Sequence, residues 1–261
     1  MTRIIVLLLP AALAFGQFEN NQSKDLKCSD RNGDSRRQRF CEVREESIPA
    51  STRFLVDAGK NGGVSIKGWN RSDVLVRALV EAWADTEADA KALASQLRVQ
   101  TGGGRINPIG PNTEGRQSWG VSFEIFVPHR TGIEAKAHNG GISLTDLQGE
   151  LSLETTNGGI HLKRLAGRVK GATKNGGVHA ELNGSRWDGS EFDVQTTNGG
   201  VHLNVPQNYS AQLEAGTVNG RLHVEGASVD KEARSYRGTI GAGGPPVRLM
   251  THNGGVHVER N

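Results

Sequence analysis

The sequence predicts an all-β protein: a β-solenoid, or β-helix-like repeat array, preceded by a β-rich part that carries one short helix. Three observations predict this fold class. The tripeptide Asn-Gly-Gly recurs along the chain, the residues around it alternate between apolar and polar, and glycine occurs 35 times in 261 residues. Aromatic residues make up only 5% of the chain, so we expect many tight turns around a thin aliphatic core.

The repeat is centred on an asparagine. Six Asn-Gly-Gly copies and one degenerate Asn-Gly-Arg copy begin at Asn61, Asn139, Asn157, Asn175, Asn198, Asn253 and, for the degenerate copy, Asn219. From Asn139 onward the steps are 18, 18, 23, 21 and 34 residues, so the base period is 18 and the longer steps contain insertions. This period fits one flattened solenoid rung of two short strands and two corners. Asn-Gly-Gly forms one corner in this interpretation, because Asn and Gly tolerate positive φ, and Gly149 and Gly167 mark the opposite corner.

The residues that follow each corner predict a strand with one face in the core. The third residue after each Asn is aliphatic: Val64, Ile142, Ile160, Val178, Val201, Leu222 and Val256. The fifth residue is also apolar: Ile66, Leu144, Leu162, Ala180, Leu203, Val224 and Val258. The residue between them is polar: Ser65, Ser143, His161, His179, His202, His223 and His257. Alternation with a period of two places the aliphatic residues inside and the polar residue in water.

The residues before each corner follow the same rule. An apolar residue lies six places before the Asn, at Ile133, Leu151, Val169, Phe192, Leu213 and Val247. A threonine lies two places before it, at Thr155, Thr173, Thr196, Thr217 and Thr251. Threonine favours strands, and we expect its hydroxyl to satisfy an amide of the turn.

A β-hairpin meander or a sandwich is the alternative architecture, because Asn-Gly is also a hairpin turn signal. The distance between equivalent strands distinguishes the two arrangements. In a parallel solenoid the equivalent strands of successive copies are neighbours about 4.8 Å apart, whereas in a meander an intervening strand doubles that spacing. The recurrence of the 18-residue step favours the solenoid.

The chain begins with two short segments that bear on its location. Residues 1–16 combine one early cation, an apolar run and small residues before Gln17, which is typical of a cleavable signal peptide. Residues 17–50 contain the only two cysteines, Cys28 and Cys41, which we expect to form a disulfide in an oxidising compartment. The sequence therefore predicts an exported protein in the periplasm, on the cell surface or outside the cell.

Two larger parts follow. Residues 51–130 form a β-rich part, with strands over 74–83 and 120–128 and one helix over about 86–97 that Thr86 caps. Residues 131–261 hold most of the repeats. After the signal peptide no apolar run is long enough to span a membrane, so we expect no transmembrane segment in the mature chain. A net charge of +3, from 31 cations and 28 anions, gives no reason to expect a nucleic-acid partner.

Five histidines occupy one column of the repeat: His161, His179, His202, His223 and His257. Imidazoles stacked about 4.8 Å apart are candidates for sharing a zinc, copper or nickel ion. No carboxylate or cysteine occurs in that column to complete a coordination shell, and a repeat copies whichever residue it contains. We therefore favour a structural, outward-facing stack, assign no cofactor, and expect protonation of neighbouring imidazoles in acid to cost stability.

Signatures of common enzymes are missing from the sequence. It contains no GxSxG elbow, HExxH helix or Walker lysine. The enzymatic alternative is a polysaccharide-cleaving β-solenoid, which needs two carboxylates at a defined separation. Four carboxylates are candidates for such a pair: Glu154, Glu181, Asp188 and Glu191. The repeat pattern gives no reason to choose one of them. We assign no catalytic residue and predict a non-enzymatic protein.

Four stretches together carry a family resemblance: CEVRE (41–45), ADTEADAKALASQLRV (84–99), VPHRTGIEAKAHNGGISL (127–144) and the repeats that follow. They resemble the bacterial putative-adhesin family of β-strand-repeat proteins, a domain of unknown function, over roughly residues 40–261. The resemblance implies an exported, envelope-associated protein that acts as an adhesin or as an interaction or structural module, with an envelope protein or a glycan as its partner. It supplies no catalytic residues. Strand edges at the ends of a solenoid leave self-association open as well.

Overall fold

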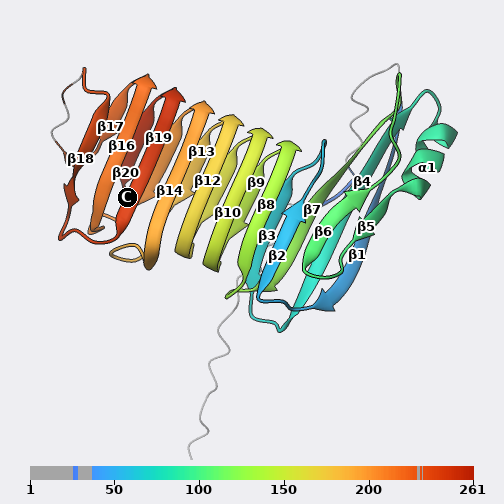
Figure 1. The fold of residues 1–261 in the computed structure, drawn as a ribbon, viewed down its shortest axis with the longest axis horizontal. Helices are drawn as coiled ribbons and strands as arrows, with labels where there is room; N and C mark the ends of the chain where they lie inside the picture. Colours follow the sequence, from blue (N-terminus) through green and yellow to red (C-terminus); the bar gives the residue numbers. More distant parts are fainter. Residues whose placement is uncertain (1–25, 29–36, 228–229, 231) are drawn as a thin grey trace, which may run out of the picture.

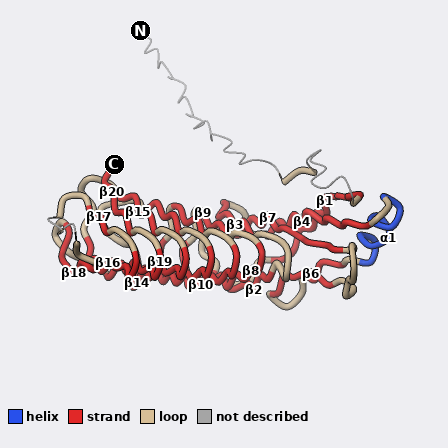
Figure 2. Tube along the Cα trace, turned by 90° about the horizontal axis from the view of Figure 1, so that it is seen from above, coloured by secondary structure: helices blue, strands red, loops and turns tan. Residues whose placement is uncertain are grey.

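The computed structural model describes residues 26–28, 37–227, 230 and 232–261. Two ten-stranded sheets lie face to face as two layers, and one helix lies at one end of the stack (Figure 1 and Figure 2). The predicted signal peptide, residues 1–16, lies outside the described residues. Within the described ranges, no helix is both long and apolar enough to cross a membrane.

The strands of the two sheets alternate along the repeat. The first sheet contains, in spatial order, β1 (Gln38–Pro49), β4 (Asp73–Ala84), β7 (Ser118–Pro128), β3 (Val64–Trp69), β9 (Ile142–Thr145), β11 (Ile160–Lys163), β13 (Val178–Glu181), β15 (Val201–Val205), β20 (Val256–Arg260) and β17 (Leu222–Val224). The second contains β18 (Ser235–Ile240), β16 (Ala211–Asn219), β19 (Pro246–Asn253), β14 (Gly189–Asn198), β12 (Ala166–Asn175), β10 (Gln148–Asn157), β8 (Gly132–Asn139), β2 (Arg53–Asp57), β6 (Arg105–Ile109) and β5 (Arg98–Gln100). Each rung therefore consists of one strand from each sheet, joined at its asparagine corner.

Parallel pairing of equivalent strands confirms the solenoid and excludes the meander. In the second sheet Leu151 of β10 lies opposite Ile133 of β8 on one side and Val169 of β12 on the other. In the first sheet β11 pairs in parallel with both β9 and β13, in the same register. Successive copies are therefore direct neighbours, as the 18-residue step predicts.

The interior is formed by the aliphatic columns of both sheets. The apolar residues before and after the corners are buried, with the single exception of Leu222, which is half-buried. Leu222 lies on β17, the edge strand of the first sheet, so one of its sides has no neighbouring strand. The alternation in the sequence thus assigns the inward face correctly, and only the end of the stack departs from it.

The N-terminal part extends the first sheet with antiparallel strands. β4 pairs antiparallel with β1 and β7, and these strands include the two stretches predicted at 74–83 and 120–128. Helix α1 (Glu87–Gln96) follows β4, with the Thr86 hydroxyl accepting a hydrogen bond from the Asp89 amide at 3.1 Å. The predicted disulfide between Cys28 and Cys41 is also confirmed.

The rungs leave sequence order at their C-terminal end. β19 lies between β14 and β16, and β20 lies between β15 and β17, so the last rung in the sequence is the second-last in space. Figure 1 shows these strands inserted into the orange and red end of the stack. The expectation that successive copies are neighbours is therefore wrong for the final copy. The 21-residue and 34-residue steps leave room for the chain to pass beyond the gap and return.

The second corner does not centre on Gly149 and Gly167, as the sequence interpretation placed it. These glycines are the second residues of β10 and β12, and of the two only Gly167 has positive φ, at 101°. Positive φ also occurs three places earlier, at the non-glycine residues Asp146 (φ 59°) and Arg164 (φ 50°). Arg164 Nε and Nη2 donate to the two Asp146 carboxylate oxygens at 2.6 Å each. This bidentate pair holds two corners together and offsets the steric cost of positive φ at non-glycine residues.

The first glycine of each Asn-Gly-Gly corner is required by the approach of the neighbouring rung. A Cβ atom on Gly158 would lie 2.1 Å from the carbonyl oxygen of Gly140, and one on Gly176 would lie 2.1 Å from that of Gly158. The asparagines themselves do not adopt positive φ; in the described chain only Asp146 and Arg164 do so among non-glycine residues. The corner therefore selects glycine for close packing, whereas the asparagine is not selected for positive φ.

Gly158→Ala should lower the free energy of unfolding by about 3 kcal/mol, the upper end for overpacking, because the obstructing atom belongs to the backbone. Gly102→Ala is the matched control, since a Cβ there meets nothing within 4 Å, and it should change stability by less than about 0.5 kcal/mol. Urea titrations of the two variants measure the difference. Equal midpoints would show that the rungs do not approach as closely as described.

Candidate functional site

The repeat asparagines form one continuous ladder of side-chain amides. Each Nδ2 donates to the Oδ1 of the neighbouring rung at 2.7 to 3.0 Å, in the order Asn61, Asn139, Asn157, Asn175, Asn198, Asn253 and Asn219. At the N-terminal end Asn61 Nδ2 donates to the carbonyl of Trp119 at 3.1 Å. The sequence pattern predicts turns at these asparagines; the ladder was not predicted, although parallel stacking of identical residues is the signal for it.

The threonine column supports the same corner from inside. Each threonine hydroxyl donates to the carbonyl of the first glycine of a neighbouring rung; for example, Thr155 Oγ1 reaches Gly140 O at 2.8 Å and Thr173 Oγ1 reaches Gly158 O at 2.8 Å. The expectation that these hydroxyls satisfy turn amides is therefore wrong. The amides are already used, because backbone pairing between rungs continues through the corner, as in Gly158 N to Asn175 O at 3.0 Å.

The five repeat histidines form a stack on the outer face of the first sheet. Ring centroids are 5.3 Å apart for His161 and His179, 4.9 Å for His179 and His202, and 5.0 Å for His202 and His257, with interplanar angles of 6° to 7°. His223, at the end of the array, is tilted by 44° from His257 at 6.3 Å. The predicted stack is therefore present, and it follows the spatial order of the rungs.

The second glycine of each histidine-bearing corner lies beside the imidazole of the same rung. A Cβ atom on Gly159 would lie 3.5 Å from Nε2 of His161, an ordinary van der Waals distance, and 3.2 Å from the carbonyl oxygen of Gly177. One on Gly255 would lie 2.9 Å from Nε2 of His257, so there the ring would have to shift.

The histidines belong to a longer line of outward residues that crosses the whole sheet. We call it the polar row; it contains one residue from each of the ten strands, in the order Glu45, Arg77, Glu124, Ser65, Ser143, His161, His179, His202, His257 and His223. Its N-terminal end is charged. Glu124 is only 4% exposed and accepts from Arg77 Nη1 at 2.5 Å and from Lys67 Nζ at 2.8 Å, while Arg77 Nε donates to Glu45 at 2.7 Å.

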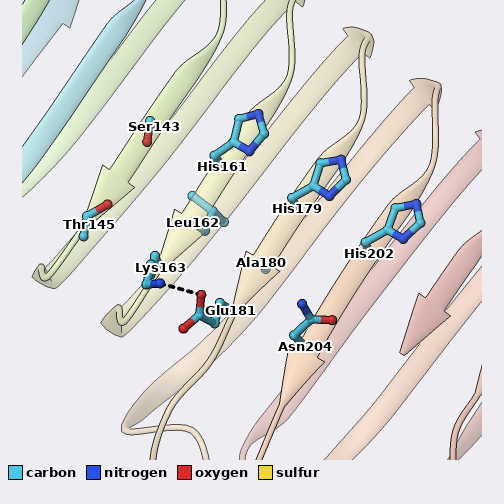
Figure 3. Close-up of a pocket in the computed structure, with 10 residues that line it drawn as sticks. All are labelled: Ser143, Thr145, His161, Leu162, Lys163, His179, Ala180, Glu181, His202 and Asn204. Carbon is cyan, nitrogen blue, oxygen red and sulfur yellow. Dashed lines mark ion pairs between the residues drawn. The ribbon is translucent and has the colours of Figure 1, made fainter. Parts of the chain in front are cut away.

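A shallow depression of about 250 Å³ lies along the middle of the polar row. Figure 3 shows His161, His179 and His202 side by side on neighbouring strands, with Lys163 and Glu181 paired beside them. The Lys163 Nζ to Glu181 Oε2 distance is 2.8 Å. Ser143, Thr145 and Asn204 complete the polar lining. The depression thus presents hydroxyl, imidazole and amide groups, together with one internally compensated ion pair.

Two of the stacked imidazoles favour the neutral form. Burial lowers the pKa of His161, and the neighbouring His179 lowers it further. Burial also lowers the pKa of His202, followed by His179 and His257, while Glu259 acts in the opposite direction. A proton on one ring therefore disfavours a proton on the next.

The geometry of the stack does not converge on a metal ion. Rings within 6° to 7° of parallel direct their nitrogen lone pairs along similar lines rather than toward a common point. In the part of the chain that the structure describes, no group of three or more His, Cys, Asp or Glu side chains is arranged to hold a metal.

The carboxylates left open for a glycosidase pair are not brought together. Glu154 and Glu191 belong to strands of the second sheet, whereas Glu181 lies on the outer face of the first. Glu191 accepts from Arg168 at 3.1 Å, and Glu181 pairs with Lys163. Asp188 lies just before β14, beside a separate depression that Trp187 and Arg164 also line.

Acid should destabilise the wild type more than a variant in which all five repeat histidines are changed to Ser, the residue that the repeat itself carries at Ser143. Because the folded-state pKa values of His161 and His202 are lowered, the unfolded chain binds more protons below about pH 6.5. The stability that the lowered pKa values contribute is fully present above that pH and is lost as the pH falls. Between pH 8 and pH 5 we expect an extra fall in Tm of about 2–4 °C, the shift that 1 kcal/mol produces in a protein of this size.

Thermal melts at the two pH values measure this difference. His138→Ser with His252→Ser is the matched control, since both residues are exposed and lie on the second sheet. An identical acid response in the wild type and the five-fold variant would remove the stack as its cause.

Comparisons with known proteins agree with the architecture. A putative cell adhesion protein from Clostridium sporogenes is similar with a TM-score of 0.50 at 12% sequence identity, covering 85% of this chain and 100% of that one. A putative adhesin from Bacteroides fragilis (TM-score 0.38, 11% identity, 84% and 97% coverage) and a putative lipid binding protein from Parabacteroides distasonis (0.33, 10%, 84% and 97%) are more distant. At these identities the first likeness concerns the fold alone.

No curated protein matches the chain. The family model described as Toastrack DUF4097 matches residues 131–259, the part that holds the stacked rungs from Asn139 onward. The match agrees with the resemblance drawn from the sequence. The repeat part of this chain, residues 131–259, is therefore similar to the Toastrack DUF4097 family, a domain of unknown function.

Proposed function

We propose that the protein is an exported, non-enzymatic interaction module of the bacterial envelope, which binds an extended glycan along the polar row. The observation that carries the proposal is the row itself: a line of outward side chains, one per strand, held in register across ten strands of one sheet. Over its histidine part, such a surface presents the same group at a regular interval. A polymer with a repeating unit makes the same contact several times on it.

The chemistry of the depression favours a partner without strong charge. Hydroxyl, imidazole and amide groups both donate and accept hydrogen bonds, as a polyhydroxyl chain requires. The only ion pair in the lining, Lys163 with Glu181, is compensated within the protein.

The rigidity of the array supports recognition rather than turnover. The polar row lies on strands that are fixed by backbone pairing, by the asparagine ladder and by the threonine bonds. Binding then costs little ordering of the protein. Of the candidate carboxylates, Glu181 and Glu191 lie on different sheets and are engaged with cations, which favours a non-enzymatic role.

Export is supported by the disulfide. Cys28 and Cys41 are joined over 13 residues, and disulfides of this kind persist in oxidising compartments. The putative cell adhesion protein from Clostridium sporogenes, with its similar fold, is compatible with a role at the envelope.

The test is binding of the chain from Gln17 onward to immobilised envelope polysaccharides and to a general glycan array. We expect retention on a subset of glycans with no release of reducing ends. Changing His161, His179 and His202 together to Ser should weaken retention at least about tenfold, because the loss of one or two hydrogen bonds near 1 kcal/mol each corresponds to that ratio. The His138→Ser and His252→Ser pair should bind like the wild type.

Three outcomes would contradict the proposal. Release of reducing ends that a single carboxylate substitution abolishes would make the protein an enzyme. Retention that the triple histidine variant leaves unchanged would move binding to another face. Retention on envelope proteins alone, with no glycan bound, would change the class of partner.

A further inference from the structure

The C-terminal rung fills a gap that the preceding chain leaves open. We define this rung as β19 and β20, residues 246–260. In sequence order the chain runs through β14 and β15, continues to β16 and β17, and turns back through β18, which pairs antiparallel with β16. The rung then enters between β14 and β16 in one sheet and between β15 and β17 in the other.

The inserted rung makes the full set of repeat contacts on both of its sides. Val247, Leu249, Val256 and Val258 are buried, at 0 to 1% exposure. Its histidine, His257, stacks on His202 on one side and contacts the tilted ring of His223 on the other. The rung therefore links the terminal strands to the rest of the stack.

The polar contacts of the rung are equally complete. Asn253 Nδ2 donates to Asn198 and its Oδ1 accepts from Asn219, both at 2.8 Å. Thr251 Oγ1 donates to Gly199 O at 2.8 Å. From the other side, Thr217 Oγ1 donates to Gly254 O at 2.8 Å. The gap therefore fits a segment that carries the aliphatic, threonine, asparagine and histidine residues of the repeat at the spacings found in β19 and β20.

The connection to the rung is short and rich in glycine. Residues 241–245 read Gly-Ala-Gly-Gly-Pro, and Gly241 and Gly243 have φ of 57° and 81°. Segments of this kind absorb large backbone changes at hinges. The rung is therefore joined to β18 through this glycine-rich connection.

We propose that the C-terminal rung exchanges between two copies of this chain, so that residues 246–260 of one copy enter the gap between β14 and β16 of the other. The two copies have identical sequences, so every contact of the inserted rung is reproduced in the exchanged dimer. Only the hinge differs between the two forms, and protein concentration then shifts their populations. A second copy is the occupant that matches the aliphatic, threonine, asparagine and histidine positions of the gap at once.

The test uses cysteine pairs on the full chain. Gln195 of β14 lies opposite Met250 of β19 on one side and opposite Ala172 of β12 on the other, with all three residues on the outer face of the second sheet. One copy carries Gln195→Cys, and the second carries either Met250→Cys or, as the matched control, Ala172→Cys. The native cysteines are already joined to each other. The copies are mixed at high concentration, warmed below the melting transition and then oxidised.

Exchange predicts at least tenfold more disulfide-linked dimer for the pair Gln195→Cys and Met250→Cys than for the pair Gln195→Cys and Ala172→Cys, because only the C-terminal rung changes partner. The yield should rise with concentration and with time before oxidation. Equal yields for the two pairs, including no dimer from either, would overturn the proposal. A single chain with both Gln195→Cys and Met250→Cys should form the bond within itself, and its failure to do so would contradict the register on which exchange depends.

Discussion

The contact on which the rest of the structure depends is the approach of one glycine backbone to the next at the asparagine corner. The position of a Cβ on Gly158 lies 2.1 Å from the Gly140 carbonyl oxygen, so the rungs meet at a distance that only glycine allows. This approach fixes the register between rungs. Once the register is fixed, equal positions in every rung become neighbours, and the amide ladder, the threonine bonds and the imidazole stack follow from it.

The sequence alone predicts most of the fold because its period and its alternation are properties of single rungs. The buried aliphatic columns, helix α1 and the strand before it follow from such local patterns. The second corner could not be located in the same way. Its left-handed residues, Asp146 and Arg164, are not glycine, and their conformation is supported by an ion pair between two rungs that exists only after stacking.

The candidate site also has features that the sequence predicts and features that depend on the stacking of rungs. Five histidines in one column are visible in the sequence, and their outward stack was predicted from it. The continuation of that column into Glu124, Arg77 and Glu45 was not, because these residues come from antiparallel strands outside the repeat period. The partner of the threonine hydroxyls was also predicted wrongly. The hydroxyls donate to glycine carbonyls, because the backbone amides at the corner already donate to the adjacent rung, and that pairing exists only in the stack.

The insertion of the last rung resolves a problem that any open stack of parallel strands has. A strand at the end of a sheet exposes unpaired backbone groups and frays. In this protein β19 and β20 lie one rung inside the stack, and β17, which has only three residues, forms the edge of the first sheet. In the second sheet β18 covers β16 in the antiparallel direction, which interrupts the parallel pattern. The cohesion of the last rungs therefore depends on β19 and β20, which pair with strands on both of their sides.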